Sequence, residues 1–400
     1  MSNINAQRLF TASCFALVTT AFAFAIRAGI LGELASKFGL TDTQLGYINQ
    51  MAILGFPIAT MVGGWLYNEF GPKRMMQLAL GSHLVGILMT IFAGDFWTLL
   101  LSNFFIGFGN GTVEAACNPM ISNMYKTNQT TMLNRFHVWF PGGIFLGALI
   151  SQFISSQPGW GWQVQIGIML IPTVIYAYLF WGQSFPERAA AGQASVAENL
   201  KGIFSPLYLF MIFCMVLTAN TELSTQQWVE RLLGSSGGAQ PMLILALVTG
   251  LMAVGRFFAG PIIHRLNPTG VLWAGAIISL LGIYLMSVST GAMTYVAAIL
   301  FAIGVCYFWP TMLGFTGEYI PKSGALGMSL MGGAGMFAVS MVQPIVGGWL
   351  DAAREAAKAT SATPEAADLA AGQATLTHLM VFPAILVVAF GALWFYMRRK

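Results

Sequence analysis

Twelve apolar stretches, each long enough to cross a lipid bilayer, follow one another between residues 9 and 397. A transmembrane helix needs about 20 apolar residues, and only a helix or a closed barrel satisfies its own backbone inside lipid. The apolar runs are continuous rather than alternating, which favours helices over barrel strands. We therefore predict an all-α integral membrane protein with twelve spans, at 9–35, 44–67, 74–93, 97–124, 132–153, 163–182, 204–229, 241–263, 270–288, 294–319, 323–350 and 377–397.

Composition and charge placement support a membrane protein and indicate its topology. Hydrophobic residues make up 56% of the chain and charged residues 8%, so the net charge of +4 does not indicate a nucleic-acid partner. With the N-terminus in the cytoplasm, most Lys and Arg residues fall on the inner side, as the positive-inside rule requires. The exceptions on the outer side are Lys37, Arg231, Arg354 and Lys358. We expect a multi-pass protein of a bacterial inner membrane with both termini cytoplasmic.

A polar segment at 184–203 divides the chain into halves of similar length, 1–183 and 204–400. Three residues at the junction of spans 2 and 3 recur 196 residues later at the junction of spans 8 and 9: Gly64, Pro72 and Gly86 match Gly260, Pro268 and Gly282. Internal repeats of this kind build transporters, with the substrate site at the midplane between the halves. We predict two six-helix bundles joined by a cytoplasmic linker. The Ala-rich outer segment 351–373 is expected to form a surface helix, with a simple connector as the alternative.

Motifs of enzyme and cofactor chemistry are missing from the sequence. It has no GxxxxGK[ST] phosphate loop, no HExxH, no GxSxG and no Cys/His cluster with metal spacing. The four cysteines all lie inside predicted spans. We expect neither an enzyme nor a metal or cofactor site, and any transport must run on an ion gradient.

The junction between spans 2 and 3 reads Gly-Trp-Leu-Tyr-Asn-Glu-Phe-Gly-Pro-Lys-Arg from Gly64 to Arg74. It resembles the Gly-x-x-x-Asp-Arg-x-Gly-Arg-Lys/Arg motif of the major facilitator superfamily, with Asn68 and Glu69 in place of Asp and Arg. The segment around Arg256, with Arg265 and Pro268, resembles the second-half counterpart. The resemblance implies alternating access by a monomer. It also implies gating roles for Gly64, Gly71, Arg74 and Arg256.

Spans 4 and 5 show a narrower resemblance, to the fucose permease group of sugar–proton symporters. That group carries Glu-x-Ala-Ala-Asn-Pro in span 4, and this chain reads Glu-Ala-Ala-Cys-Asn-Pro from Glu114 to Pro119. A sugar-contacting residue of the group falls at His137. The protonatable Asp of its span 1 falls at Ala28, beside Arg27, so this chain departs from the group there.

Two intramembrane carboxylates are the candidate proton sites. A carboxylate inside the membrane is costly unless it is neutral, paired or hydrated, and such residues are functional by default. Glu114 lies near the middle of span 4, with Asn118 one turn further on the same face. Glu222 lies in span 7 and is the second candidate. The alternative for Glu114 is a structural residue locked to Arg27 or Asn118.

Arg27, in the outer half of span 1, has three competing interpretations. It can pair with Glu114, bind an anionic or hydroxyl-rich substrate through its fork of donors, or extend outward as a structural anchor. The remaining candidate substrate residues are polar or aromatic, since amides bind hydroxyls and aromatic rings suit a pyranose. They are Asn118, His137, Asn220, Gln226, Gln227, Trp228, Tyr307 and Trp309. The alternative is that these side chains pack between helices, are solvated at a helix end, or mark the point where a helix leaves the membrane.

These observations predict a secondary active transporter of a small polar solute in the lipid bilayer. Proton-coupled sugar uptake is the favoured function. A carrier of a sugar acid or other organic acid, with Arg27 as charge partner, is the alternative. A multidrug exporter is disfavoured because the candidate residues are polar. A non-transporting membrane receptor gives no reason for an intramembrane Glu and Arg.

Overall fold

The computed structural model describes residues 4–126, 129–186, 196–234, 236 and 238–398, and these residues contain helices and connections but no strand. By their contacts they divide into two compact units, Met1–Leu40 with Tyr47–Gly192 and Thr41–Gly46 with Gln193–Lys400. The start of the second helix therefore belongs to the second unit. Residues 187–195 of the predicted linker lie outside the described residues. The last eight residues of the linker form helix α8 (Val196–Ile203).

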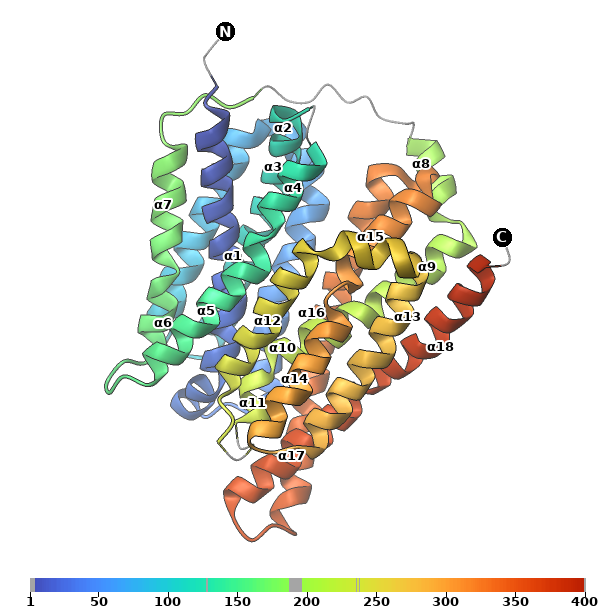
Figure 1. The fold of residues 1–400 in the computed structure, drawn as a ribbon. Helices are drawn as coiled ribbons and strands as arrows, with labels where there is room; N and C mark the ends of the chain where they lie inside the picture. The colour runs from blue at the N-terminus through green and yellow to red at the C-terminus, as the bar shows by residue number, and fades with distance from the viewer. Residues whose placement is uncertain (1–3, 127–128, 187–195, 235, 237, 399–400) are drawn as a thin grey trace. The chain divides into compact units, whose positions relative to one another are not determined.

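The first unit is built around α1 (Ala6–Phe38), which is apolar on almost every face and largely buried. It packs against α5 and α7 most extensively, and also against α3 (Figure 1). Asn5 caps its N-terminus by accepting from the N–H of Arg8, and Gly39 ends it in the left-handed conformation. The other helices of this part of the chain are α2 (Asp42–Ile91), α3 (Phe96–Met124), α4 (Gln129–His137), α5 (Trp139–Ser155), α6 (Trp162–Ile168) and α7 (Leu170–Phe180).

The second unit packs α13 against α14 and α18, and α16 against α9 and α17. A π-helical turn, η1 (Asn220–Ser224), interrupts its first membrane helix. The remaining elements are α9 (Pro206–Ala219), α10 (Thr225–Gln227), α11 (Val229–Leu233), α12 (Pro241–Phe257), α13 (Ala259–Val288), α14 (Ala292–Val305), α15 (Phe308–Tyr319), the 3-10 turn η2 (Pro321–Ser323), α16 (Gly324–Lys358), α17 (Pro364–Leu379) and α18 (Val381–Arg398).

Each of the twelve predicted spans coincides with helical residues, which confirms the all-α membrane fold. Ten helices of the described chain are long and apolar enough to cross a membrane, and α12 is a shorter apolar helix. Several spans are broken where a continuous helix was expected. Span 5 breaks at Val138, span 6 at Met169, span 7 at the π turn and span 10 at Cys306 and Tyr307.

The internal repeat has a structural counterpart at its two prolines. Gly71, immediately before Pro72, has φ +73°, and Asn267, immediately before Pro268, has φ +54°. A proline disfavours α-helical geometry in the residue before it, and a positive φ is accessible to Gly and, at a cost, to Asn. Each break therefore separates two spans at the equivalent place in the repeat.

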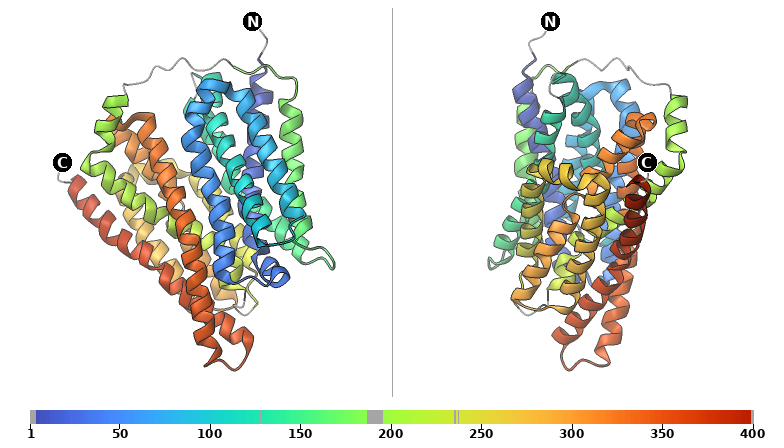
Figure 2. Two further views of the ribbon diagram at one scale, coloured as in Figure 1. Left: turned by 180° about the vertical axis from the view of Figure 1, so that it is seen from behind. Right: turned by 45° about the vertical axis from the view of Figure 1, so that its right-hand side comes forward.

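The segment 351–373 is helical except at 359–363, but it belongs to two helices and does not form one surface helix. The helix of span 11 continues through Asp351 to Lys358, and Pro364 begins α17, which leads almost without interruption into α18. The two helices run side by side as a hairpin that turns at 359–363 (Figure 2). The Ala-rich composition favours helix formation, so the spans simply extend past the apolar stretch instead of ending there.

Candidate functional site

Glu114, Asn118 and His137 form one hydrogen-bonded group in the first unit. Asn118 Nδ2 donates to Glu114 Oε2 at 2.7 Å, because the two residues lie one turn apart on α3. His137 ends α4 and places its Nε2 3.1 Å from Asn118 Oδ1 and its Nδ1 3.9 Å from Glu114 Oε1. The Glu114 side chain is 15% exposed and that of His137 is 45% exposed.

This arrangement joins a candidate proton site to two residues expected to contact substrate. Since Asn118 Nδ2 donates to Glu114, its Oδ1 is free to accept from His137 Nε2, which then carries the ring proton of the neutral imidazole. The other nitrogen, Nδ1, faces the carboxylate. The group can therefore hold a proton on either Glu114 or His137, and the imidazole is its exposed member.

Arg27 is buried on α1, with 3% of its surface exposed. Its guanidinium carbon lies 5.1 Å from the centre of the Phe24 ring, a cation–π contact. Such burial disfavours the interpretation of Arg27 as an outward-reaching anchor. The ion pair that the structure gives Glu114 is the one with His137.

Glu222 lies in the π-helical turn of the second unit and pairs with Arg256 of α12. Arg256 Nη2 is 3.3 Å from Glu222 Oε1, and Arg256 Nε donates to the carbonyl oxygen of Cys306 at 2.8 Å. The half-buried Tyr307 donates its hydroxyl to the carbonyl of Gly255 at 2.9 Å. The structure thus brings together a predicted proton site, a predicted gating residue and a predicted substrate residue.

The other polar residues of span 7 are buried and already engaged within the second unit. Asn220 donates to the carbonyl of Val216 and accepts from Ser224, and Gln226 contacts the sulfur of Met252. Gln227 is also buried.

Trp228 is fully buried and donates its indole N–H to Gln343 Oε1 at 2.9 Å. A sugar can stack on this ring only after neighbouring side chains move. The partner, Gln343 of α16, was not a sequence candidate.

The remaining predicted residues occupy scattered positions. Trp309 is half-buried on α15, close to Gly335 of α16. Gly71 forms the break before span 3, and Arg74 beyond it is exposed. Gly64 lies within α2, and its packing falls outside what the structure describes.

A buried histidine in span 3 escaped the sequence analysis. His83 Nδ1 lies 3.0 Å from the hydroxyl of Tyr176, and its Nε2 lies 3.0 Å from Asn110 Oδ1. The ring packs against Gly109, where a Cβ would collide with it. A titratable residue inside an apolar span is the signal that would have indicated this network.

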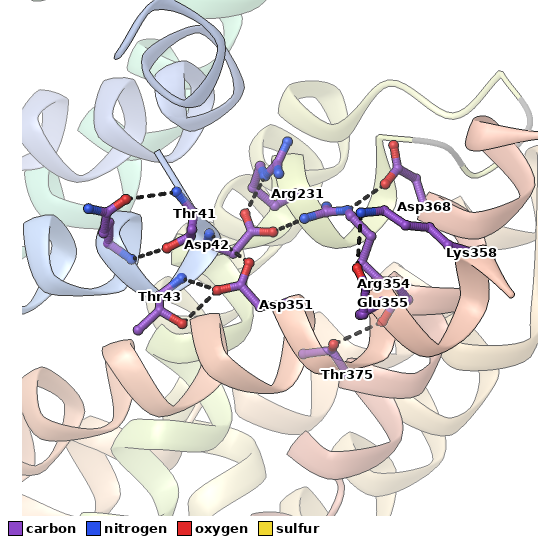
Figure 3. Close-up of polar contacts among 12 residues, drawn as sticks. Thr41, Asp42, Thr43, Arg231, Asp351, Arg354, Glu355, Lys358, Asp368 and Thr375 are labelled. Atoms are coloured by element: carbon purple, nitrogen blue, oxygen red, sulfur yellow. Dashed lines mark hydrogen bonds and ion pairs between the residues drawn. The ribbon is translucent and has the colours of Figure 1, made fainter. Parts of the chain in front are cut away.

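A charged cluster around Asp42, within the second unit, was also missed (Figure 3). The buried Asp42 carboxylate pairs with Arg231 Nε at 2.8 Å and with Arg354, which also donates to Asp368 at 2.6 Å. Asp351 accepts from the backbone N–H groups of Asp42 and Thr43 at 2.9 and 2.8 Å, and so caps α2.

Metal and thiol chemistry find no site in the described part of the chain. No group of three or more His, Cys, Asp or Glu side chains there is placed to hold a metal ion. Cys14, Cys117, Cys214 and Cys306 are free and buried.

Comparison with known proteins defines the class. The model of the Major Facilitator Superfamily matches residues 13–344, and the chain belongs to this family of membrane transporters. The fold is similar to that of the D-xylose-proton symporter, with a TM-score of 0.78 and 11% sequence identity over 97% of both chains.

Two curated relatives show how far sequence similarity extends. The chain is 26% identical over 391 residues to a gallate transporter of Pseudomonas putida, covering 82% of this chain and 85% of the relative. It is 30% identical over 155 residues to myo-inositol transporter 1 of Candida albicans, covering 37% of this chain. The chain spans only 27% of the length of that inositol transporter.

Proposed function

We propose that this protein is a secondary active transporter that couples movement of a small polar solute to a proton at Glu114. The hydrogen-bonded group of Glu114, Asn118 and His137 carries this proposal. Its carboxylate is largely withdrawn from solvent while its imidazole is partly exposed, so a proton can enter through His137. No phosphate-loop motif is present in the sequence, which leaves an ion gradient as the energy source.

Coupling requires that proton and solute favour the same conformation. A ligand shifts a conformational equilibrium only through its differential affinity for the two states. A deprotonated Glu114 inside the membrane carries a cost that protonation removes. Proton binding therefore favours conformations in which the surroundings of Glu114 are less hydrated, and solute binding adds to that shift.

A neutral sugar is the first candidate solute. The resemblance of the Glu114–Pro119 segment to the fucose permease group supports it, as do the amides of Asn220, Gln226 and Gln227, which suit hydroxyl groups. The fold similarity to a D-xylose-proton symporter is consistent with it, although it concerns the fold alone.

A hydroxylated carboxylic acid is the second candidate, and a specific observation favours it. The gallate transporter of P. putida matches over most of the length of both chains. Two arginines of this chain lie inside predicted spans and away from their starts: Arg27, which is buried, and Arg256, which is partly exposed. A desolvated arginine suits a carboxylate through its planar fork of donors.

The proposal also includes the oligomeric state, the membrane and the orientation of the transporter. We place it as a monomer in a bacterial inner membrane with both termini cytoplasmic, with the lipid bilayer as its solvent and no nucleic-acid partner. The excess of Lys and Arg on the expected inner side supports this orientation.

Proton movement in liposomes holding the purified protein tests the function. Neutral sugars and organic acids are added one at a time while external pH is recorded, for the wild type and for Glu114→Gln. We expect alkalinisation outside with one solute and its loss in Glu114→Gln. Glu318→Gln, which neutralises an exposed carboxylate, is the matched control and should behave as the wild type.

The choice of solute decides between the candidates. A response to a sugar identifies the first candidate, and a response only to acids identifies the second. Transport that persists at the wild-type rate, with unchanged proton movement, in Glu114→Gln would contradict the assignment of the proton site.

A further inference from the structure

Glu222 lies in the π-helical turn that follows α9, and its partner Arg256 lies in the last turn of α12. Glu222 is 16 residues from the start of α9 and Arg256 is 15 residues from the start of α12. At about 1.5 Å per residue these positions lie roughly 22–24 Å along each helix, within the span of a hydrocarbon core about 30 Å thick. Arg256 is therefore an intramembrane arginine rather than a loop residue.

The guanidinium of Arg256 retains unused donors. Its contacts are the Nε bond to the Cys306 carbonyl and the Nη2 contact with one oxygen of Glu222. A guanidinium has five N–H donors. At 3.3 Å, the contact with Glu222 is longer than the 2.7–2.9 Å typical of charge-assisted bonds. Among the described residues, Arg256 thus holds Glu222 by one long contact, and the remaining donors of its fork bond to no described side chain.

Access to the pair is asymmetric. The Arg256 side chain is 22% exposed and the Glu222 side chain 8%. Glu222 is held in a π-helical turn, a feature often found at functional sites. The Tyr307 hydroxyl, on the carbonyl of the residue preceding Arg256, adds a polar group beside it. Arg256 is therefore the more exposed member of the pair, and the proposal below requires that a small anion reach its guanidinium.

We propose that Arg256 is the binding site for the carboxylate of the solute and that Glu222 is the carboxylate it replaces. The solute takes up the free donors of Arg256, and Glu222 accepts a proton as its contact with Arg256 is released. This inference rests on the proposed function and selects its second candidate, an organic acid, with Arg256 in place of Arg27 as charge partner.

Charge balance gives the physical reason. An arginine inside the membrane needs a partner, and in the empty site Glu222 supplies one negative charge. Two carboxylates beside one guanidinium would leave a net negative charge in a poorly solvated site. Protonation of Glu222 removes that excess, so the site has no net charge both when empty and when loaded with one carboxylate and one proton. Among the described titratable side chains, Cys306 interacts with Glu222, and Tyr307 bonds to the carbonyl of Gly255 next to Arg256.

Calorimetric binding to the purified full-length protein tests the inference. The probes are gallate and D-gluconate, each compared with a neutral counterpart, 3,4,5-trihydroxybenzamide and D-glucitol. Titrations in buffers of different ionisation enthalpy report proton uptake on binding. We expect at least one acid to bind more than tenfold tighter than its neutral counterpart, with about one proton taken up per acid bound.

Variants separate the roles of the two residues. Arg256→Gln should weaken acid binding at least tenfold, and Arg256→Lys by less. Glu222→Gln should bind the acid as tightly as the wild type or tighter, because the competing carboxylate is gone, and should lose the proton uptake. Arg265→Gln, which removes an exposed arginine of the same unit, is the matched control. If Arg256→Gln fails to fold, Arg256→Gln combined with Glu222→Gln avoids an unpaired buried carboxylate.

Three results would overturn the inference: no acid binds the wild type, the neutral counterparts bind equally well, or Glu222→Gln retains proton uptake. Its failure is distinguishable from failure of the proposed function. Sugar-driven proton movement that depends on Glu114 would leave the transporter assignment standing while excluding a carboxylate site at Arg256. Acid binding that survives in Glu114→Gln would support the site independently of coupling at Glu114.

Discussion

At the residue scale, polar side chains inside the helices are held in pairs and chains. Asn118 connects Glu114 to His137, and His83 connects Tyr176 to Asn110. Buried polar groups need partners because an unsatisfied one costs about 1–3 kcal/mol. The sequence indicated Glu114 through its place in an apolar span. The same signal was present for His83, but nothing in the spacing shows which helix face meets Tyr176.

Replacing Asn118 should impair coupling more than stability. In Asn118→Ala, Glu114 loses a 2.7 Å hydrogen bond and its link to His137, so we expect proton-driven uptake to fall about tenfold, as loss of about 1.4 kcal/mol implies. Initial rates in liposomes at several pH values measure the effect. Asn103→Ala, on the same helix, removes an amide that bonds only to the carbonyl of Leu99 and should retain coupling. Equal losses in both variants would contradict a specific role for Asn118.

Replacing His83, unlike replacing Asn118, should impair stability more than coupling. His83→Leu leaves the Tyr176 hydroxyl and the Asn110 amide oxygen without their partner, at a cost of about 2 kcal/mol. We expect a lower thermal unfolding midpoint in detergent with unchanged solute preference. Tyr176→Phe removes one hydroxyl only and should lower the midpoint less. A His83→Leu protein as stable as the wild type would show that the network contributes nothing to folding.

At the element scale, close helix packing and charged clusters set the geometry. A Cβ at Gly107 of α3 would overlap the carbonyl oxygen of Ala52, so α2 and α3 approach backbone to backbone at this point. Small residues permit such approach between membrane helices. At the start of α2, Asp351 caps the helix while Asp42 pairs with two arginines.

Gly107→Ala should therefore disrupt the packing of α2 on α3. The added methyl forces the helices apart, which costs about 1–3 kcal/mol. Lower yield of monodisperse protein and a lower unfolding midpoint measure this. Gly81→Ala is the control, because a Cβ there meets no atom within 4 Å and alanine favours the helix by about 1 kcal/mol. Gly81→Ala should be neutral or stabilising, and the same result for Gly107 would contradict the close approach.

Asp42→Asn should destabilise the second unit. Arg231 and Arg354 lose the carboxylate that they share, and their side chains are only about one-fifth exposed. Removing one partner of a buried pair costs about 3–5 kcal/mol, which partial exposure of the arginines reduces to about 2 kcal/mol. Thermal unfolding monitored by tryptophan fluorescence measures the change. Glu355→Gln, which breaks an exposed pair with Lys358, should cost less than about 0.5 kcal/mol.

At the scale of the whole molecule, charge distribution predicts the orientation in the membrane. We expect Lys358→Cys in intact bacterial cells to react with a membrane-impermeant maleimide, and Arg74→Cys to react only after permeabilisation. Both positions are exposed, and the four native cysteines are buried, so background labelling should be low. Labelling of Arg74→Cys in intact cells would reverse the proposed topology.

The sequence alone indicated the all-helical membrane class and gave two candidate proton sites, Glu114 and Glu222, which remain predictions. A bilayer demands long apolar helices. The length of each apolar stretch and the isolated charged residues within it can be read directly from the sequence. The repeat around Pro72 and Pro268 was visible for the same reason, since a proline acts on the residue just before it.

Only the tertiary structure decided which charged residues pair. Glu222 and Arg256 lie 34 residues apart, and Asp42 lies more than 180 residues from both of its arginines. Sequence separation carries no information about which helix faces meet, because that depends on packing along the whole length of each helix. The broken helices at Val138 and at the π turn, and the extension of α16 to Lys358, likewise follow from contacts that a hydropathy pattern does not contain.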